Sequence, residues 1–447
     1  MPRGSVRSRL PELRHRHDRE ILRLAVPALG ALVAEPLFLL GDSAVVGRLG
    51  TAPLGGLGAA GSLLTTVVSL CVFLAYGTTA AVSRRMGAGD AAGAVRQGVD
   101  GLWLAVGLGV LLAVVGQPLV PFAVDALGAT ADVAPYAVTY LRIGLLGLPG
   151  MLVVLAGTGV LRGLLDTRTP LVVAVTAAVA NLGLNVVLVL GLGLGIAGSA
   201  VGTVLAQTGS AVVYVIVVVR GARRHGVPLS PDRRGIATSA TAGFGLLVRT
   251  ALLRVTLLAA TTVAARLGTE SLAAYQVSYV VWSLLALALD AIAIAGQALT
   301  GRFLGAGDVA GARDATHRMV EWGLAVGVTV GLLVLAVHTV LPHGFSADPS
   351  VRGLIAVSLL VVAAQQPLAG VVFALDGILI GAGDNTYLAL ASLLTTAVFL
   401  PAAAAVLLTE ATLPWLWGAI AVWMVARCVT LVVRVRGDRW LVTGATR

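Results

Sequence analysis

The chain has little of what a soluble enzyme needs. Only 12% of its 447 residues are charged, whereas soluble domains carry about 25%. It has no lysine, its two cysteines (Cys71 and Cys428) lie inside apolar segments, and its six histidines are scattered. Two GxGxxG matches, Gly56–Gly61 and Gly193–Gly198, follow no strand pattern. We therefore expect no disulfide framework, no metal site, no other cofactor and no enzymatic activity.

Long apolar runs are what the sequence has instead. Hydrophobic residues make up 58% of the chain, and runs long enough to cross a bilayer recur along its whole length. These runs predict an all-α integral membrane protein with twelve transmembrane helices. We place them at residues 21–46, 55–81, 97–120, 134–159, 169–192, 197–219, 238–265, 271–299, 319–341, 352–380, 386–409 and 411–433.

The arginines between these runs predict the orientation. Clusters of arginine fall in the N-terminal tail and in every second loop, whereas the opposite loops hold only Arg48, Arg266 and Arg352. Because positively charged loops stay in the cytoplasm, we expect a multi-pass protein of the cell inner (plasma) membrane with both termini cytoplasmic.

The sequence repeats itself with an offset of 218 residues. "RLGT" at Arg48 returns at Arg266, and "GAGDAAGA" at Gly87 returns as "GAGDVAGA" at Gly305. "GVLRGLLDT" returns as "GILIGAGDN" in the same register. We infer a tandem duplication that gives two pseudo-symmetric six-helix lobes in parallel orientation. The predicted domains are a disordered basic cytoplasmic tail (1–20), an N-terminal lobe (21–219), a cytoplasmic linker (220–237), a C-terminal lobe (238–436) and a cytoplasmic tail (437–447).

Two carboxylates stand in the first apolar run, in "AEPLFLLGDSAVVGRLGT". Each charged side chain costs at least about 2.5 kcal/mol at a bilayer centre, so a plain lipid-facing helix has no reason to carry them. Glu35 and Asp42 are seven residues apart, which places them on one helix face. The repeat has Leu253 and Ala260 at these positions, so the acidic chemistry belongs to the first lobe alone.

Further polar residues extend this site. Asn181 and Asn185 share a helix face, and Thr203 lies in the next, glycine-rich run. With Glu35 and Asp42 they form our predicted ion-coupling site. The alternatives are structural: asparagine often joins helices in membranes, and Asp42 is close to a loop. Residues of a predicted substrate cavity are Gln207, Tyr275, Gln276, Tyr279, Gln366 and Asp376.

Two other features are interpreted as structural. In "RRMGAGD" the glycines allow a tight turn and Asp90 is expected to cap the following helix. Arg249 and Arg254 in the seventh run are placed to neutralise acids or to extend toward the membrane surface.

The longest of these motifs carry a resemblance. "AEPLFLLGDSAVVGRLGT", "RRMGAGD", "GVLRGLLDTRTPL", "NLGLNVVLVLGLGLGIAGSAVGT" and "GRFLGAGD" resemble the multidrug and toxic compound extrusion (MATE) family, in its DinF-like branch. The resemblance implies two six-helix lobes and export of cationic or amphipathic small molecules by proton or sodium antiport. It also implies that Asp42, Asn181 and Thr203 match coupling-site residues of the first, fifth and sixth helices.

The chain departs from that family at two positions. Asn185 stands where several relatives carry a second aspartate, and Asp376 resembles a tenth-helix acid of NorM-type members whose seventh-helix acidic partner is absent here. We therefore expect a proton-coupled antiporter working by alternating access, with sodium coupling as the less favoured reading. We expect a monomer in a lipid bilayer with no nucleic-acid partner. The alternative function is a lipid or oligosaccharide flippase of the same superfamily.

Overall fold

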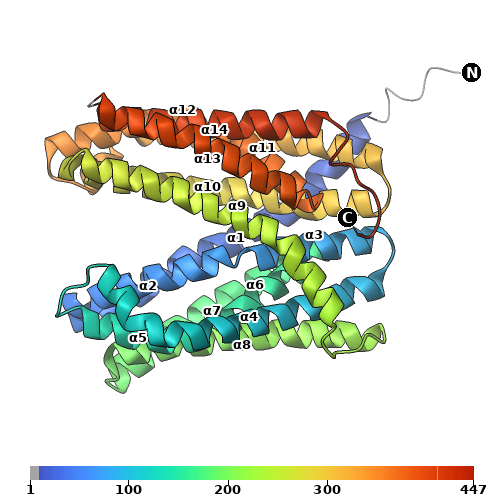
Figure 1. The fold of residues 1–447 in the computed structure, drawn as a ribbon, viewed down its shortest axis with the longest axis horizontal. Helices are drawn as coiled ribbons and strands as arrows, with labels where there is room; N and C mark the ends of the chain where they lie inside the picture. The colour runs from blue at the N-terminus through green and yellow to red at the C-terminus, as the bar shows by residue number, and fades with distance from the viewer. Residues whose placement is uncertain (1–9, 410, 447) are drawn as a thin grey trace, which may run out of the picture. The chain divides into compact units, whose positions relative to one another are not determined.

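The computed structural model describes residues 10–409 and 411–446, and within them it is helical with no strand. Figure 1 shows the helices in chain order. Their bounds are α1 Leu10–Val46, α2 Thr51–Leu70, α3 Phe73–Gly87, α4 Ala91–Ala126, α5 Ala134–Leu146, α6 Leu148–Gly163, α7 Arg168–Asn185, α8 Gly195–Arg224, α9 Arg233–Arg266, α10 Thr269–Gly305, α11 Val309–Val337, α12 Pro349–Gly381, α13 Asn385–Leu408 and α14 Leu413–Arg436.

The predicted all-α transmembrane fold is confirmed. Eleven spans within the described residues are long and apolar enough to cross a membrane, with α2 and α3 together forming one of them. The pair α5 and α6, bent by 52°, brings the number to twelve if it counts as one span. The bend lies at Gly147, two residues before Pro149, which lacks the backbone N–H that a continuous helix uses. Most spans run longer than predicted because hydropathy marks only their lipid-facing part, whereas Arg168–Gly191 and Asn385–Leu408 have the predicted length.

The sequence repeat is also a structural repeat. Gly89 and Gly307 both adopt positive φ angles, 77° and 74°. The aspartate after each glycine accepts a hydrogen bond from a backbone N–H three residues on, at 2.8 Å for both Asp90 and Asp308. The predicted capping role of Asp90 is therefore confirmed, and the turn recurs in the second half.

Helix packing repeats as well. A Cβ on Gly159 of α6 would lie 2.5 Å from the carbonyl oxygen of Ala75, and one on Gly377 of α12 would lie 2.3 Å from that of Ala293. These residues are 218 positions apart in both pairs. Only glycine allows so close an approach of two helices, the small-residue contact common in membrane proteins.

The chain divides into two compact units that do not coincide with the predicted lobes. The first-half unit is Gly30–Leu247, and the second-half unit combines the chain up to Leu29 with Val248–Ala445. The long helices α1 and α9 thus each contribute to both units. Each of these helices is one continuous apolar run in the sequence, so hydropathy does not indicate that it is divided between two units.

The predicted disordered tail is partly wrong. Residues 1–9 lie outside the described part of the chain, but residues 10–20 belong to α1. Asp18 forms an ion pair with Arg318 of α11 and accepts a hydrogen bond from Trp322 at 2.8 Å. Glu20 pairs with Arg302 of α10 at 2.9 Å. These acids tie the start of α1 to the second-half unit.

The predicted linker, residues 220–237, is hydrogen-bonded to a helix of the first-half unit, to which it belongs. In the loop after α8, the carbonyl oxygens of Pro228 and Leu229 accept hydrogen bonds from Arg96 (2.7 Å) and Trp103 (2.9 Å) of α4. The tail after α14 is likewise packed, because the Trp440 side chain is buried and donates to the Val435 carbonyl at 3.0 Å.

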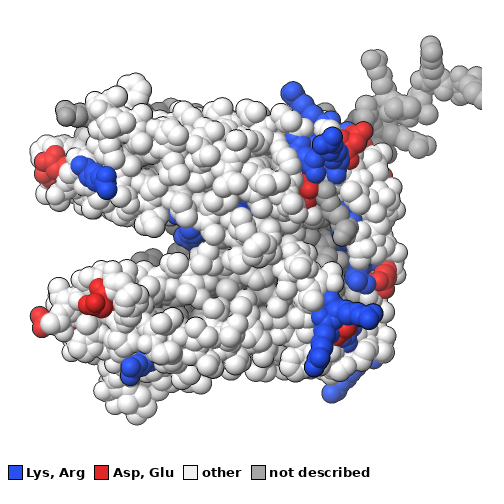
Figure 2. All heavy atoms as spheres, in the orientation of Figure 1, with Lys and Arg blue, Asp and Glu red and all other residues white. Residues whose placement is uncertain are grey.

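Within each unit, arginine side chains gather at one end of the helices, with few at the other (Figure 2). This distribution leads to a topology prediction. We expect a reporter fused after Arg224 to lie in the cytoplasm and one inserted near Asp132 to lie outside, because the arginine-rich ends stay inside. Paired phosphatase and fluorescent-protein fusions measure this, and the reverse pattern would contradict the assignment.

Candidate functional site

Asp42 lies on α1 in the first-half unit, and only 1% of it is exposed. Its carboxylate is reached by side chains from α7 and α8. Asn185 donates a hydrogen bond from Nδ2 to Asp42 Oδ1, and the Thr203 hydroxyl lies 3.3 Å from Oδ2. The structure thus brings together three residues that are far apart in the sequence and that were predicted to form one site.

Asn181 completes the group. One amide atom of Asn181 lies 2.7 Å from Asp42 Oδ1, and the orientation that places nitrogen there also lets the amide oxygen accept from Thr203. We adopt that orientation because an amide oxygen facing a carboxylate would be repelled. The Tyr140 hydroxyl of α5 lies 3.4 Å from Thr203 Oγ1 and extends the network. Within the described residues, the partners of the Asp42 carboxylate are therefore neutral.

The local backbone positions these side chains. Helix α7 ends at Asn185 and continues as one π-helical turn, Val186–Gly191. Such turns are rare and often mark functional sites. Gly202 on α8 leaves room for the asparagine, because a Cβ there would lie 2.8 Å from Asn185 Oδ1. That oxygen is buried and has no hydrogen-bond partner among the described residues.

We expect Gly202→Ala to lower transport at least about tenfold. The added methyl group would collide with Asn185 Oδ1 and displace the amide whose nitrogen contacts Asp42, and a hydrogen bond to a charged group contributes about 1.5–3 kcal/mol. Initial export rates in vesicles measure the effect. Gly209→Ala on the same helix is the control, because a Cβ there meets nothing within 4 Å. Equal rates for both variants would contradict a working role for the Asn185–Asp42 contact.

Glu35 is placed apart from this group. It lies two turns before Asp42 on α1, about 10 Å along the helix axis, and is exposed. The shared face predicted from the sequence therefore does not make the two acids neighbours. Gln207 lies one turn beyond Thr203 on α8 and is half-buried, and its part in a substrate cavity stays a prediction.

Asp376 of α12 has a different environment in the second-half unit. Its carboxylate forms ion pairs with Arg249 of α9, at 2.7 Å, and with Arg427 of α14. All three side chains are buried. The expectation that Arg249 neutralises an intramembrane acid is confirmed, whereas Arg254 is exposed. The Arg427 guanidinium also lies 5.0 Å from the centre of the Trp423 ring.

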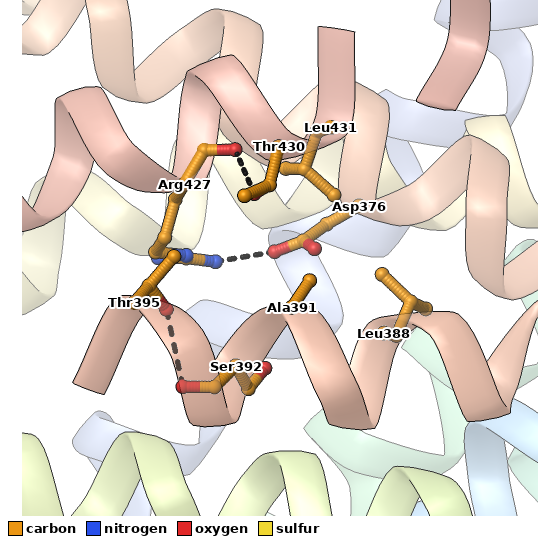
Figure 3. Close-up of a pocket in the computed structure, with 8 residues that line it drawn as sticks. All are labelled: Asp376, Leu388, Ala391, Ser392, Thr395, Arg427, Thr430 and Leu431. Carbon is orange, nitrogen blue, oxygen red and sulfur yellow. Dashed lines mark hydrogen bonds and ion pairs between the residues drawn. The ribbon is translucent and has the colours of Figure 1, made fainter. Parts of the chain in front are cut away.

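A small pocket opens beside this ion pair, between α12, α13 and α14 (Figure 3). Figure 3 shows Arg427 and Asp376 pointing toward each other, with Ser392 and Thr395 of α13 below them. Its lining residues are Asp376, Leu388, Ala391, Ser392, Thr395, Arg427, Thr430 and Leu431. Asp376 and Arg427 are the charged members of this lining.

The other predicted cavity residues are only partly brought together. Tyr275 and Tyr279 of α10 stack at 6.0 Å between ring centroids, and Tyr275 also contacts the ring of Trp417 at 5.7 Å. Gln276, the chain neighbour of Tyr275, is exposed. Gln366 is buried and donates to the Val362 carbonyl of its own helix at 3.2 Å.

Sequence reasoning missed two residues of these sites, Tyr140 and Arg427. For Arg427 a signal existed, because a charged side chain inside the last apolar run indicates a specific role. For Tyr140 none did, since tyrosine is common in membrane helices. Within the described residues, no group of three or more His, Cys, Asp and Glu side chains is arranged to hold a metal ion.

The MatE family model matches residues 27–187 and 246–404, once in each half of the chain. The chain belongs to the MatE family. This confirms the resemblance to multidrug and toxic compound extrusion transporters, and the protein is a multi-pass membrane protein of that family. The double match also agrees with the repeat.

Relatives cover nearly the whole of this MatE protein. DNA damage-inducible protein F of Escherichia coli (strain K12) is 29% identical over 94% of this chain and 90% of its own. Protein DETOXIFICATION 43 of Arabidopsis thaliana is 27% identical over 93% of this chain and 90% of its own. The fold matches that of an outward-facing multidrug resistance MATE family transporter with a TM-score of 0.84, at 20% identity over 94% of this chain and 96% of the other.

Proposed function

We propose that this MatE protein exports small molecules, organic cations and amphipathic compounds among them, in exchange for protons. One observation carries the proposal: Asp42 is a carboxylate in a membrane span, 1% exposed, whose described hydrogen-bond partners are neutral. A buried charge without a counter-ion is costly in a membrane, so one proton relieves that cost.

Proton binding changes the hydrogen bonds of the whole group. An ionised carboxylate only accepts hydrogen bonds, whereas a protonated one also donates. Asn185 Oδ1, which has no described partner, can accept from that new donor once the amide turns it toward Asp42. Rotation of one buried amide then repacks α7 and α8 against α1. In the proposed cycle this repacking biases alternating access of the two lobes and weakens the hold on a bound cation.

The orientation and setting are part of the proposal. We propose a monomer in the inner membrane with both termini in the cytoplasm. The arginine-rich helix ends support the orientation (Figure 2). A lipid or oligosaccharide flippase is the second candidate, because the buried Arg249 and Arg427 are the kind of cationic side chains that an anionic lipid headgroup needs.

A panel of uptake assays in inside-out vesicles tests the proposal. Accumulation of fluorescent organic cations is measured while the pH and sodium gradients are imposed separately. We expect uptake that follows the pH gradient and stops when a protonophore collapses it. Lipid translocation without any uptake of the small molecules would favour the flippase instead.

A further inference from the structure

Five arginines lie close together in the chain where α8 ends and α9 begins, in the first-half unit. They are Arg220, Arg223, Arg224, Arg233 and Arg234. All five are exposed, and none of their side chains has an ion-pair partner among the described residues. Residues 220–234 hold one acid, Asp232. Five arginines against one aspartate leave an excess of four positive charges on this segment, which we call the arginine surface.

Arginines at the arginine-rich end of the second-half unit have acidic partners. Arg302 forms an ion pair with Glu20 at 2.9 Å, and Arg434 forms one with Asp384 at 2.6 Å. Membrane orientation depends on the number of arginines on one side and hardly on the acids beside them. Orientation alone therefore does not explain why the arginine surface has so few acids around it.

The first turns of α4 hold the arginine surface in place. Arg96 of α4 donates to the Pro228 carbonyl oxygen at 2.7 Å and pairs with Asp100 at 3.0 Å. Asp100 is buried, and a Cβ on Gly235 would lie 2.3 Å from its Oδ2. The loop after α8 and the start of α9 are thus packed directly on α4. The arginines belong to a fixed surface and not to a free tail.

An exposed tryptophan lies beside this surface. The Trp103 side chain of α4 is 43% exposed, and its indole N–H donates to the Leu229 carbonyl oxygen at 2.9 Å. Leu229 is itself an exposed apolar side chain. Tryptophan combines an apolar ring with one polar donor and is enriched where a membrane meets water. Trp103 therefore places the arginine surface at the depth of the phospholipid headgroups.

We propose that the arginine surface binds the headgroups of anionic phospholipids in the leaflet that it faces. The planar guanidinium group matches the geometry of a phosphate, and clusters of four or more arginines beside a membrane helix attract acidic lipids. Trp103 and Leu229 add apolar surface that a lipid covers and that a soluble polyanion such as nucleic acid leaves in water. Binding is measured without transport, so its failure would leave the export proposal unaffected.

Quenching of Trp103 fluorescence by brominated phospholipids tests the proposal. The full-length protein is placed in bilayers of phosphatidylglycerol and phosphatidylcholine, with bromine on one lipid or the other, and the signal of Trp103→Phe is subtracted. The ratio of the two quenching constants measures the preference for the anionic lipid. We expect a ratio of at least about five, the effect of one arginine near an anionic surface. A ratio of one, or no quenching of Trp103 by either lipid, would overturn the proposal.

Matched double variants separate charge from folding. Arg223→Gln with Arg224→Gln should at least halve the ratio, whereas lysine at both positions keeps the charge and should retain most of it. Arg48→Gln with Arg266→Gln removes the same charge from exposed positions in the opposite loops and should leave the ratio unchanged. An unchanged ratio in the first variant, or an equal loss in the lysine or the opposite-loop variant, would overturn the proposal.

Soluble anions distinguish a lipid site from other anion sites. Inorganic phosphate should lower the ratio no more than sodium chloride of the same ionic strength does, because salt screens all exposed charges. A larger loss with phosphate would assign the surface to free phosphate and overturn the proposal. Binding of a short DNA oligonucleotide to the protein in pure phosphatidylcholine bilayers, together with a lipid ratio of one, would assign it to a soluble polyanion instead.

Discussion

Asp42→Asn is expected to leave the protein folded and inserted while gradient-driven export falls to the level of vesicles without the protein. The amide has nearly the same shape as the carboxylate but cannot exchange a proton. The fold tolerates it because Asn185 can turn its amide so that Oδ1, which has no described partner, accepts from the new side chain. Initial rates of fluorescent-cation uptake in inside-out vesicles measure the loss.

Two comparison variants sharpen that prediction. Asp125→Asn makes the same chemical change at an exposed position near the end of α4 and should keep full transport. Glu35→Gln should impair transport only in part, since Glu35 is exposed and about 10 Å from Asp42 along the helix axis. Full transport by Asp42→Asn would remove the proton-exchange role from this carboxylate.

Asp376→Asn is expected to destabilise the protein by about 3–5 kcal/mol, the usual cost of removing one partner of a buried ion pair. The variant leaves Arg249 and Arg427 close together with no carboxylate between them. Arg427→Gln should cost clearly less, because Asp376 keeps its 2.7 Å contact with Arg249. Thermal unfolding of the purified proteins in detergent measures both.

The informative result is which of the two variants, Asp376→Asn or Arg427→Gln, loses more stability. Asp314→Asn, at an exposed site on α11, is the control and should shift the unfolding free energy by less than about 0.5 kcal/mol. An Arg427→Gln variant that unfolds as readily as Asp376→Asn would mean that Arg249 alone does not hold the carboxylate.

The sequence predicts the fold well because the bilayer limits the choices. Every backbone polar group in lipid needs an internal partner, so long apolar runs become helices. The 218-residue repeat then divides those helices into related halves. The break at Gly147 and the division of α1 between two units were not predictable, because both depend on which neighbours a helix packs against.

The Asp42 site was predictable in its members but not in its bonds. Asn181 and Asn185 are four residues apart on one helix, so a common partner for both was a natural expectation. Glu35 is exposed whereas Asp42 is buried. This difference depends on which helices surround α1, and residue spacing along a single helix gives no information on its neighbours. The role of Arg427 depends on α12 and α14 coming together, and only the structure shows that.

Proton coupling is tested most directly by transport of the purified protein in liposomes made in sodium-free buffer, with an imposed pH gradient. Sodium would need several oxygen ligands, and the side-chain oxygens of Asp42, Asn181, Asn185 and Thr203 are the set it would use. A single carboxylate with neutral partners needs only a proton. We predict that substrate moves in sodium-free buffer when the pH gradient is applied and that adding a sodium gradient changes nothing. Transport that is absent under the pH gradient and starts only with sodium would contradict proton coupling through Asp42.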